Sequence, residues 1–203
     1  YYYFKSAYSQ AIDDCFDLSW ALRAKRAEYN ALVDLQNRID SGDYKSIRQS
    51  YYSAIPLYGD SGGQYNIAKN GCGIVAGIIA VSITGIDVDV HDAILQMGAA
   101  KNKIIQGAVN PIAVSEYLMQ NGLTPNASNA QSLSPNSTYI TYYKWVDDVD
   151  RKGSNWHYIC FTTDSECNVT PYNAWCKKEN ISWEAFANEE GIVFQPGFTQ
   201  WIK

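Results

Sequence analysis

Apolar residues recur at helical spacing through the first forty positions of the chain. They stand three or four residues apart with charged residues between them, and Ser41-Gly42-Asp43 follows where a helix end is expected. The periodic positions are Ala11, Ile12, Phe16, Trp20, Ala24, Ala27, Ala31 and Leu35. The pattern predicts a helix over residues 1–40. It is either docked on the main domain, a linker coil of a longer protein, or a pro-segment covering an active site.

The middle of the chain changes from loop to apolar sequence. Residues 50–71 are rich in Tyr, Gly and Ser, which is typical of loops. The apolar run 74–81 follows; its β-branched residues favour a strand, whereas small residues at helical spacing favour a helix. Those small residues are Gly73, Ala76, Gly77 and Ala80, and they form a stripe where another element can approach closely. A continuous apolar run does not decide between the two by periodicity.

The residue pattern in the second half of the chain predicts helices first and strands afterwards. Residues 87–98, with Asp89 as N-cap, and residues 111–121 have helical patterns, and the polar stretch 125–138 predicts a surface loop. Strands are expected over 138–146, 156–162 and 169–175. The last two are joined by a turn near Ser165, which predicts an antiparallel hairpin. This order predicts an α+β fold.

Composition narrows the classes of function. The 203 residues are 46% hydrophobic and 18% charged, as in a globular protein, and the net charge is −5. A chain without a positive field is a poor partner for nucleic acid. No apolar run approaches the roughly 18 residues that a membrane span needs. The chain opens with Tyr1 and has no basic or apolar leader, so we expect either a mature product or a trimmed chain, with any targeting signal already removed.

Cys72 is the first candidate for chemistry. It stands between Gly71 and Gly73 at the start of the apolar run. A thiol at a helix N-terminus is favoured as thiolate by the helix dipole and the free N–H groups. Flanking glycines allow the backbone to approach a substrate and to direct N–H groups at an oxyanion. Cys72 therefore has the features of a nucleophile, although a small buried cysteine beginning a core helix has the same local sequence.

His157 and Asn173 are candidates for a base and its orienting partner. His157 opens a predicted strand, and the alternative for it is a strand histidine in solvent. Counting along the hairpin from Ser165 pairs Cys160 with Thr170 and Tyr158 with Tyr172, which brings Asn173 close to His157. A polar side chain there can accept a hydrogen bond from the ring and fix its tautomer. The other histidine, His91, is expected to be an ordinary residue in the first turn of a helix.

The residues around Cys72 carry a family resemblance. Tyr58-Gly59 and then Ile67-Ala68-Lys69-Asn70-Gly71-Cys72-Gly73 resemble the extracellular cysteine peptidase-like family related to the bacterial double-glycine, bacteriocin-processing peptidases. These are papain-like proteins with an upstream Gln, a Gly-Cys-Gly opening a helix, a His opening a strand, and an Asp or Asn on the next strand. The order matches over residues 47–176. The resemblance thus implies a helix after Cys72.

The resemblance also implies a division of the chain and a reaction. Residues 1–46 are then an N-terminal helical segment and residues 47–203 a papain-like cysteine peptidase domain. Cys72, His157 and Asn173 form the catalytic triad. Gln49 contributes to the oxyanion hole, and Gln64, nearer to Cys72, is the alternative. The expected activity is a hydrolase that cleaves peptide or amide bonds, secreted or held at a bacterial cell surface. The alternatives are an inactive peptide- or cell-wall-binding module and an acyl or peptidyl transferase.

No metal or other cofactor is expected. Cys160, Cys167 and Cys176 lack the short paired spacing of zinc ligands. The cysteines other than Cys72, namely Cys15, Cys160, Cys167 and Cys176, allow three disulfide pairings between which the sequence does not choose. The acidic residues Asp147, Asp148 and Asp150 predict a solvated turn more readily than a calcium loop. The oligomeric state stays open.

Overall fold

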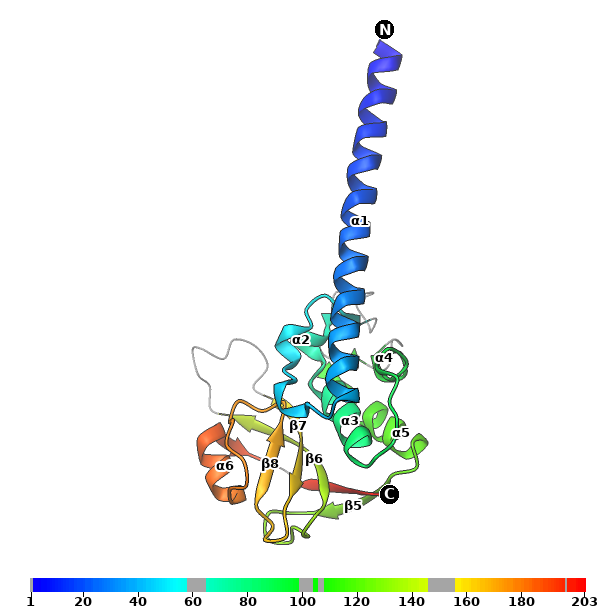
Figure 1. Ribbon diagram of the computed structural model, residues 1–203. Coiled ribbons are helices and arrows are strands. Elements are labelled where there is room, and N and C mark those ends of the chain that lie inside the picture. The colour runs from blue at the N-terminus through cyan, green and yellow to red at the C-terminus, as the bar shows by residue number, and fades with distance from the viewer. Residues whose placement is uncertain (1, 58–64, 99–103, 106–107, 146–155, 196) are drawn as a thin grey trace.

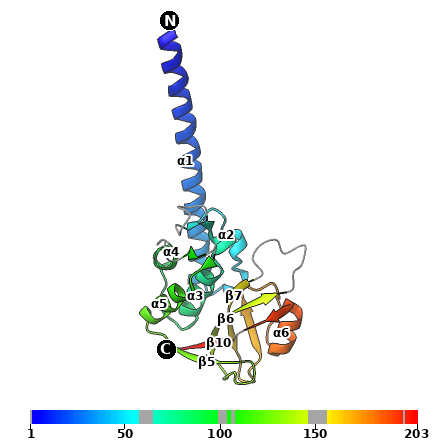
Figure 2. The ribbon, with the colours of Figure 1, turned by 180° about the vertical axis from the view of Figure 1, so that it is seen from behind.

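The structure is a computed structural model that describes residues 2–57, 65–98, 104–105, 108–145, 156–195 and 197–203. A long N-terminal helix stands above a domain that consists of a helical layer and an antiparallel sheet (Figure 1). The view from behind shows the helical layer on one side of the sheet and a further helix, α6, on the other (Figure 2). The chain is therefore α+β, with an N-terminal helix and an antiparallel sheet.

The N-terminal helix docks on the domain only at its C-terminal end. α1, Tyr2–Asp40, ends just before Gly42, whose φ is +71°, as the sequence predicted. Leu35 and Ile39 are buried in the main core, where α1 lies against α4 and the short helix η1, Tyr44–Ser46. Phe16 and Trp20, which belong to the predicted apolar face, are instead 64% and 66% exposed. The docked interpretation is thus correct for the last turns alone, and the rest of α1 projects from the domain (Figure 1).

The helical layer is built around the apolar run. It comprises α2, Ile67–Asn70, α3, Cys72–Ile83, α4, Val90–Gly98, and α5, Pro111–Gln120. The helix expected after Cys72 is confirmed, and its small residues do admit close neighbours. A Cβ on Gly77 would lie 3.2 Å from the Met97 sulfur and 3.4 Å from Val114. α4 begins at its predicted N-cap, because Asp89 accepts a bond from the N–H of Asp92. α5 begins after Asn110, a cap that was not predicted, which accepts a bond from the N–H of Ile112.

Short elements connect these helices. They are η2, Gln49–Tyr51, and two small antiparallel strand pairs. One pair is β1, Pro56–Leu57, with β2, Tyr65–Asn66, and the other is β3, Ile104–Ile105, with β4, Ala108–Val109. The stretch 50–71, expected to be loop, therefore contains β1, β2 and α2 among its described residues.

Six strands of the described chain form one antiparallel sheet. They are β5, Thr124–Ser128, β6, Thr138–Trp145, β7, Trp156–Thr163, β8, Val169–Tyr172, β9, Ile192–Phe194, and β10, Phe198–Ile202. Their order is β5-β10-β6-β7-β8, and β9 pairs with β6 beyond the end of β10. The face toward α3 carries Ile140, Cys160 and Trp201. The opposite face forms an aromatic cluster under α6, Trp183–Glu190.

Three expectations about the sheet need correction. β5 occupies part of the stretch 125–138 that was expected to be a loop, because β10 provides a pairing partner for it. The hairpin register is shifted by two residues, since Cys160 pairs with Tyr172 rather than with Thr170. β8 ends at Tyr172, so Asn173 lies just beyond the strand. The division of the chain at residue 46 stays a prediction.

Candidate active site

Cys72 begins α3 at a crowded corner of the fold. Only Gly71 separates α3 from α2, and a Cβ on Gly71 would lie 2.7 Å from the Cα atom of Ile67. A Cβ on Gly73 would lie 3.2 Å from the side chain of Val114. The two glycines flanking Cys72 are therefore required by packing against α2 and α5. The sequence had suggested that they serve the approach of a substrate; the structure assigns them this structural task.

The thiol of Cys72 is buried against strand β7. Burial raises the pKa of this thiol, and hydrogen bonding to the backbone of Tyr158, Gly73 and Cys72 itself opposes the rise. The net direction is upward, which is contrary to the expectation that the helix N-terminus favours a thiolate. In the resting protein Cys72 is thus a thiol, and it needs a base to become a nucleophile.

His157 is held by a backbone carbonyl. Its Nε2 lies 2.6 Å from the carbonyl oxygen of Asn173. A carbonyl only accepts hydrogen bonds, so Nε2 carries the proton and Nδ1 of the neutral ring keeps its lone pair. Burial lowers the pKa of His157, while the bond to Asn173 and the charge of Glu190 raise it. The result is a neutral imidazole whose Nδ1 carries the lone pair that a base requires.

The orienting role assigned to Asn173 is only partly as predicted. Asn173 does reach His157, but through its carbonyl and not through its side chain. The side-chain amide instead pairs with Gln49: Oδ1 accepts from the Gln49 N–H at 2.9 Å, and Nδ2 donates to Gln49 Oε1 at 3.2 Å. Asn173 has a φ of +57°, a left-handed conformation that asparagine tolerates better than most residues. This turn aims its carbonyl and its amide at two different partners.

Gln49 links this turn to the segment before Cys72. Its Nε2 donates to the carbonyl of Ala68 in α2 at 3.1 Å. A continuous set of hydrogen bonds therefore runs from His157 through Asn173 and Gln49 to Ala68, four residues before Cys72. The other glutamine considered for the oxyanion hole, Gln64, lies outside the described residues. The structure thus brings Gln49 to the neighbourhood of Cys72.

The Cys72 thiol contacts strand β7 at Tyr158, the residue next to His157. The thiol is bonded to the backbone of Tyr158. Neighbouring side chains in a strand point to opposite faces. Tyr158 packs on the core shared with α3, while the His157 ring lies beside Trp145 and Tyr143, with ring centroids 5.1 Å and 5.9 Å away. The His157 ring therefore lies on the face of the sheet that carries Tyr143, opposite to the face on which Tyr158 packs with α3.

Glu190 is a site residue that the sequence did not indicate. Its carboxylate is fully buried and accepts from the Tyr143 hydroxyl and the Cys176 N–H at 2.6 Å each, and from the Trp175 N–H at 3.1 Å. Its negative charge raises the pKa of His157. In the sequence it is the second of two adjacent acids, Glu189 and Glu190, a pattern that many surface segments share. Only the packing of α6 under the sheet distinguishes it.

The remaining candidates lie elsewhere. His91 is an exposed residue in the first turn of α4, as expected. All five cysteines are free thiols, and the acidic residues 147–150 lie outside the described residues. Within the described part of the chain no three His, Cys, Asp or Glu side chains are grouped as metal ligands. Among these residues, too, no helix has both the length and the apolar character that crossing a bilayer takes.

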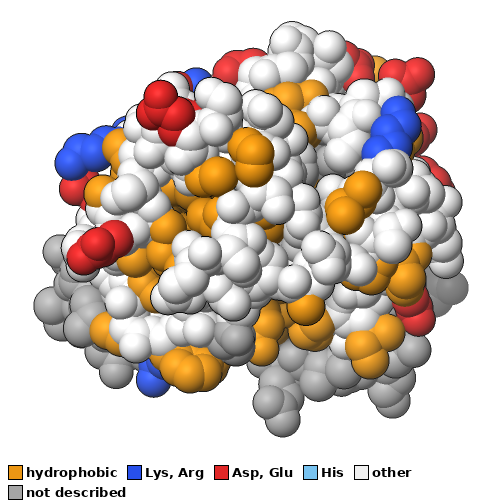
Figure 3. Space-filling view, turned by 90° about the horizontal axis from the view of Figure 1, so that it is seen from below, with side chains coloured by type: hydrophobic (Ala, Val, Ile, Leu, Met, Phe, Trp, Pro, Cys, Tyr) orange, Lys and Arg blue, Asp and Glu red, His pale blue; other side chains and the backbone are white. Residues whose placement is uncertain are grey.

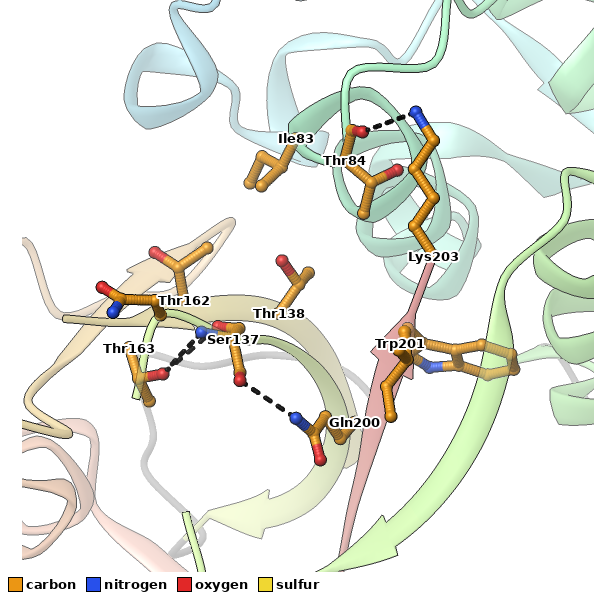
Figure 4. Close-up of a pocket in the computed structure, with 11 residues that line it drawn as sticks. Ile83, Thr84, Ser137, Thr138, Thr162, Thr163, Gln200, Trp201 and Lys203 are labelled. Carbon is orange, nitrogen blue, oxygen red and sulfur yellow. Dashed lines mark hydrogen bonds between the residues drawn. The ribbon is translucent and has the colours of Figure 1, made fainter. Parts of the chain in front are cut away.

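A cavity of about 470 Å³ lies at the other end of α3, beside Ile83 and Thr84 (Figure 4). Its polar lining is engaged within the protein: Lys203 Nζ donates to the Thr84 carbonyl at 3.2 Å, and Gln200 Nε2 to Ser137 Oγ at 3.0 Å. The cavity is therefore separated from Cys72 by the length of α3.

Figure 3 shows the face of the molecule at the end opposite α1. Charged side chains lie toward the edges of this face, and hydrophobic side chains are scattered among uncharged groups.

The comparisons with known proteins add no relative. No protein-family model matches the chain, and a search of curated proteins finds no match either.

Proposed function

We propose that the chain is a papain-like cysteine peptidase or amidase that cleaves a peptide or amide bond through a thioester on Cys72. One observation carries the proposal: the Cys72 thiol at the start of a buried helix is hydrogen-bonded to the backbone of Tyr158, the residue next to His157 in strand β7, and the Asn173 carbonyl keeps the proton of His157 on Nε2. A nucleophile, a base and an orienting group are what acyl transfer requires. The order of a helical layer and then an antiparallel sheet supports the papain-like arrangement.

The reaction follows from the two protonation states. Because the thiol and the imidazole both rest uncharged, Nδ1 of His157 takes the thiol proton as the sulfur attacks the substrate carbonyl. The oxyanion forms near the first N–H groups of α3, which have no partner within the helix. His157 then gives its proton to the leaving amine, which breaks the C–N bond and leaves a thioester. Water, deprotonated by His157, releases the acid and restores the thiol.

Gln49 and Asn173 support this reaction in different ways. The Asn173 carbonyl holds the protonated Nε2 and stabilises the imidazolium that forms during attack. Gln49 is held against α2 close to Cys72, which suits a contribution to the oxyanion hole. We further propose a peptide or protein substrate and a secreted or cell-surface location, both on the family resemblance of residues 47–176.

A second candidate is an inactive module that keeps the fold for peptide or cell-wall recognition. The observation that favours it is the engagement of Gln49, whose amide is bonded to both Asn173 and Ala68. In such a module the thiol stays buried and unreactive when a peptide is bound.

Trapping of an acyl-enzyme separates the two candidates. The protein is incubated with an activated peptide ester, and intact-mass and peptide mass spectrometry locate the adduct. We expect a thioester on Cys72 that is lost in Cys72→Ala and formed at least about 10²-fold more slowly in His157→Gln. Cys160→Ala is the matched control, because Cys160 is also a buried thiol but stands within strand β7, three residues after His157. Equal adduct formation in wild type and His157→Gln, or none at Cys72, would contradict the peptidase proposal.

A further inference from the structure

Glu190 is a buried carboxylate on the side of the sheet where the His157 ring lies. It is the last residue of α6, the helix that packs under this face, and it is fully buried. Two features make a negative charge costly there: burial removes water from the carboxylate, and the C-terminal end of a helix carries the negative end of the helix dipole. A charge in this position therefore needs donors from other elements.

The donors come from strand β6 and from the segment that follows β8. The Tyr143 hydroxyl and the Trp175 N–H donate to Oε1 of Glu190, and the Cys176 N–H donates to Oε2. Hydrogen bonds to an ionised carboxylate are stronger than those between neutral groups. These three donors thus offset the cost of burying the charge.

The groups that Glu190 binds are the same ones that hold His157. Tyr143 is the cross-strand partner of His157, and the two rings meet edge to face. The segment 173–176 presents the Asn173 carbonyl to Nε2 of His157. Glu190 therefore fixes a neighbour of the ring in β6 and the chain two and three residues beyond Asn173.

A cation, Arg48, binds the same segment. Its guanidinium donates to the Ala174 carbonyl, one residue after Asn173. The charge of Arg48 lowers the pKa of His157, whereas the charge of Glu190 raises it. Within the part of the chain that the structure describes, the charges that act on the ring are thus an anion from α6 and a cation before η2, both bonded to residues 174–176.

We propose that Glu190 is a positioning residue for His157, which anchors the segment 174–176 and supplies the negative charge that stabilises the imidazolium. During attack the S–H bond of Cys72 breaks and an N–H bond forms at Nδ1 of His157, so the ring becomes positively charged near the carboxylate. Glu190 keeps its charge and takes no proton. This role in catalysis rests on the proposed function, whereas the anchoring and the effect of the charge do not.

The pKa of His157, measured by NMR titration, tests the effect of the charge. Glu190→Gln should lower this pKa by about 0.5–1, because the ring loses a nearby anion, and Arg48→Met should raise it. Glu189→Gln is the matched control: it removes the same charge from the adjacent residue, which is exposed and ion-paired with Lys178, and it should leave the pKa unchanged. If Glu190 had only a packing role, its loss would admit water to the ring and raise the pKa toward 6.5. Such a rise, or no change, would overturn the proposal.

A measurement on the wild type covers the case in which Glu190→Gln does not fold. With the glutamate carboxyl groups labelled with ¹³C, one buried carboxylate should show a step in its chemical shift at the pKa of His157, because two interacting groups each respond to the protonation of the other. The step should be absent in His157→Gln. No such step, or one that persists in His157→Gln, would contradict the proposal.

Acylation of Cys72 separates this proposal from the proposed function. Glu190→Gln should form the thioester about 3- to 10-fold more slowly than the wild type, and the acidic limb of its pH profile should move to lower pH with the pKa of His157. Glu189→Gln should react as the wild type does. If the wild type forms no thioester, the proposed function fails, while the pKa comparison still tests Glu190. If the pKa falls in Glu190→Gln and the rate is unchanged, the role of Glu190 in catalysis is wrong.

Discussion

His157 shows how a single buried residue combines two functions. Its Nε2 is tied to the Asn173 carbonyl, and its ring is enclosed by Tyr143 and Trp145, so the protein stabilises one tautomer of the neutral ring. The nearby carboxylate of Glu190 and the bond to Asn173 work against the desolvation that lowers the pKa of His157. A base in this setting becomes protonated only at a pH below the ordinary histidine range.

The lowered pKa of His157 predicts how stability depends on pH. The folded protein binds the proton less readily than the unfolded chain, whose histidine has the ordinary value of 6.5. The free energy of unfolding therefore falls as pH decreases below 6.5, toward the lower pKa of the folded state. Urea unfolding at pH 7.5 and at pH 5.5 measures this loss, which His157→Gln should reduce. His91→Gln alters the other histidine, which is exposed, and should leave the loss unchanged; an equal effect of both variants would contradict the prediction.

At the scale of elements, the pair Gln49 and Asn173 joins the helical layer to the sheet. Gln49 lies in η2 and Asn173 just after β8, and they exchange two hydrogen bonds. Gln49→Ala removes the acceptor of the Asn173 Nδ2 bond but keeps the backbone N–H that bonds Oδ1, whereas Asn173→Gly removes both bonds. Both variants therefore lose the same side-chain bond, and their effects should not be additive. We expect a coupling free energy of about 1 kcal/mol between Gln49→Ala and Asn173→Gly in urea unfolding. Glycine is chosen because it keeps the left-handed backbone of residue 173.

A distant residue provides the control for this cycle. Asn121 bonds the Tyr117 carbonyl at the end of α5 and shares no partner with Gln49. Gln49→Ala and Asn121→Ala should therefore be additive within about 0.5 kcal/mol. Additivity in the Gln49 and Asn173 cycle as well would show that their bonds do not link the two layers energetically.

The sequence correctly predicted several elements whose boundaries are set by neighbouring residues. The helices after Asp89 and Asn110 begin at side-chain caps, and α1 ends at a glycine, so their boundaries follow from nearby residues. β5 could not be predicted in this way, because its polar sequence becomes a strand only by pairing with β10 far along the chain. α6 was not predicted, although Ser182 caps its first turn and Gly191, with a φ of +74°, ends it. The strands β9 and β10 had no distinct signal. Tertiary pairing decides such segments.

The sequence predicted which residues belong to the candidate site, but it did not predict how they are arranged. Cys72, His157, Asn173 and Gln49 were identified by residue type and order, and the structure ties the last three together. The register of the hairpin depended on the turn, and a shift of two residues moved Asn173 past the strand end. Its carbonyl consequently replaced its side chain as the partner of His157. Glu190 acts through burial, which residue type does not encode.

At the scale of the whole molecule, α1 belongs to the domain at one end and extends beyond it at the other. Leu35 and Ile39 are buried in the same core as α3, whereas Leu18 and Leu22 are exposed. The lower turns of α1 therefore stabilise the fold, whereas the upper turns present these side chains to solvent.

A truncation separates these two contributions. Deleting residues 1–28 removes no buried side chain of the described chain, so the free energy of unfolding at low concentration should change by less than about 0.5 kcal/mol. Leu35→Ala in the full chain should lower it by about 2–5 kcal/mol, because it opens a cavity in the core. Urea unfolding measures both. If the truncated chain were destabilised as strongly as Leu35→Ala, the upper turns of α1 would have to support the domain itself.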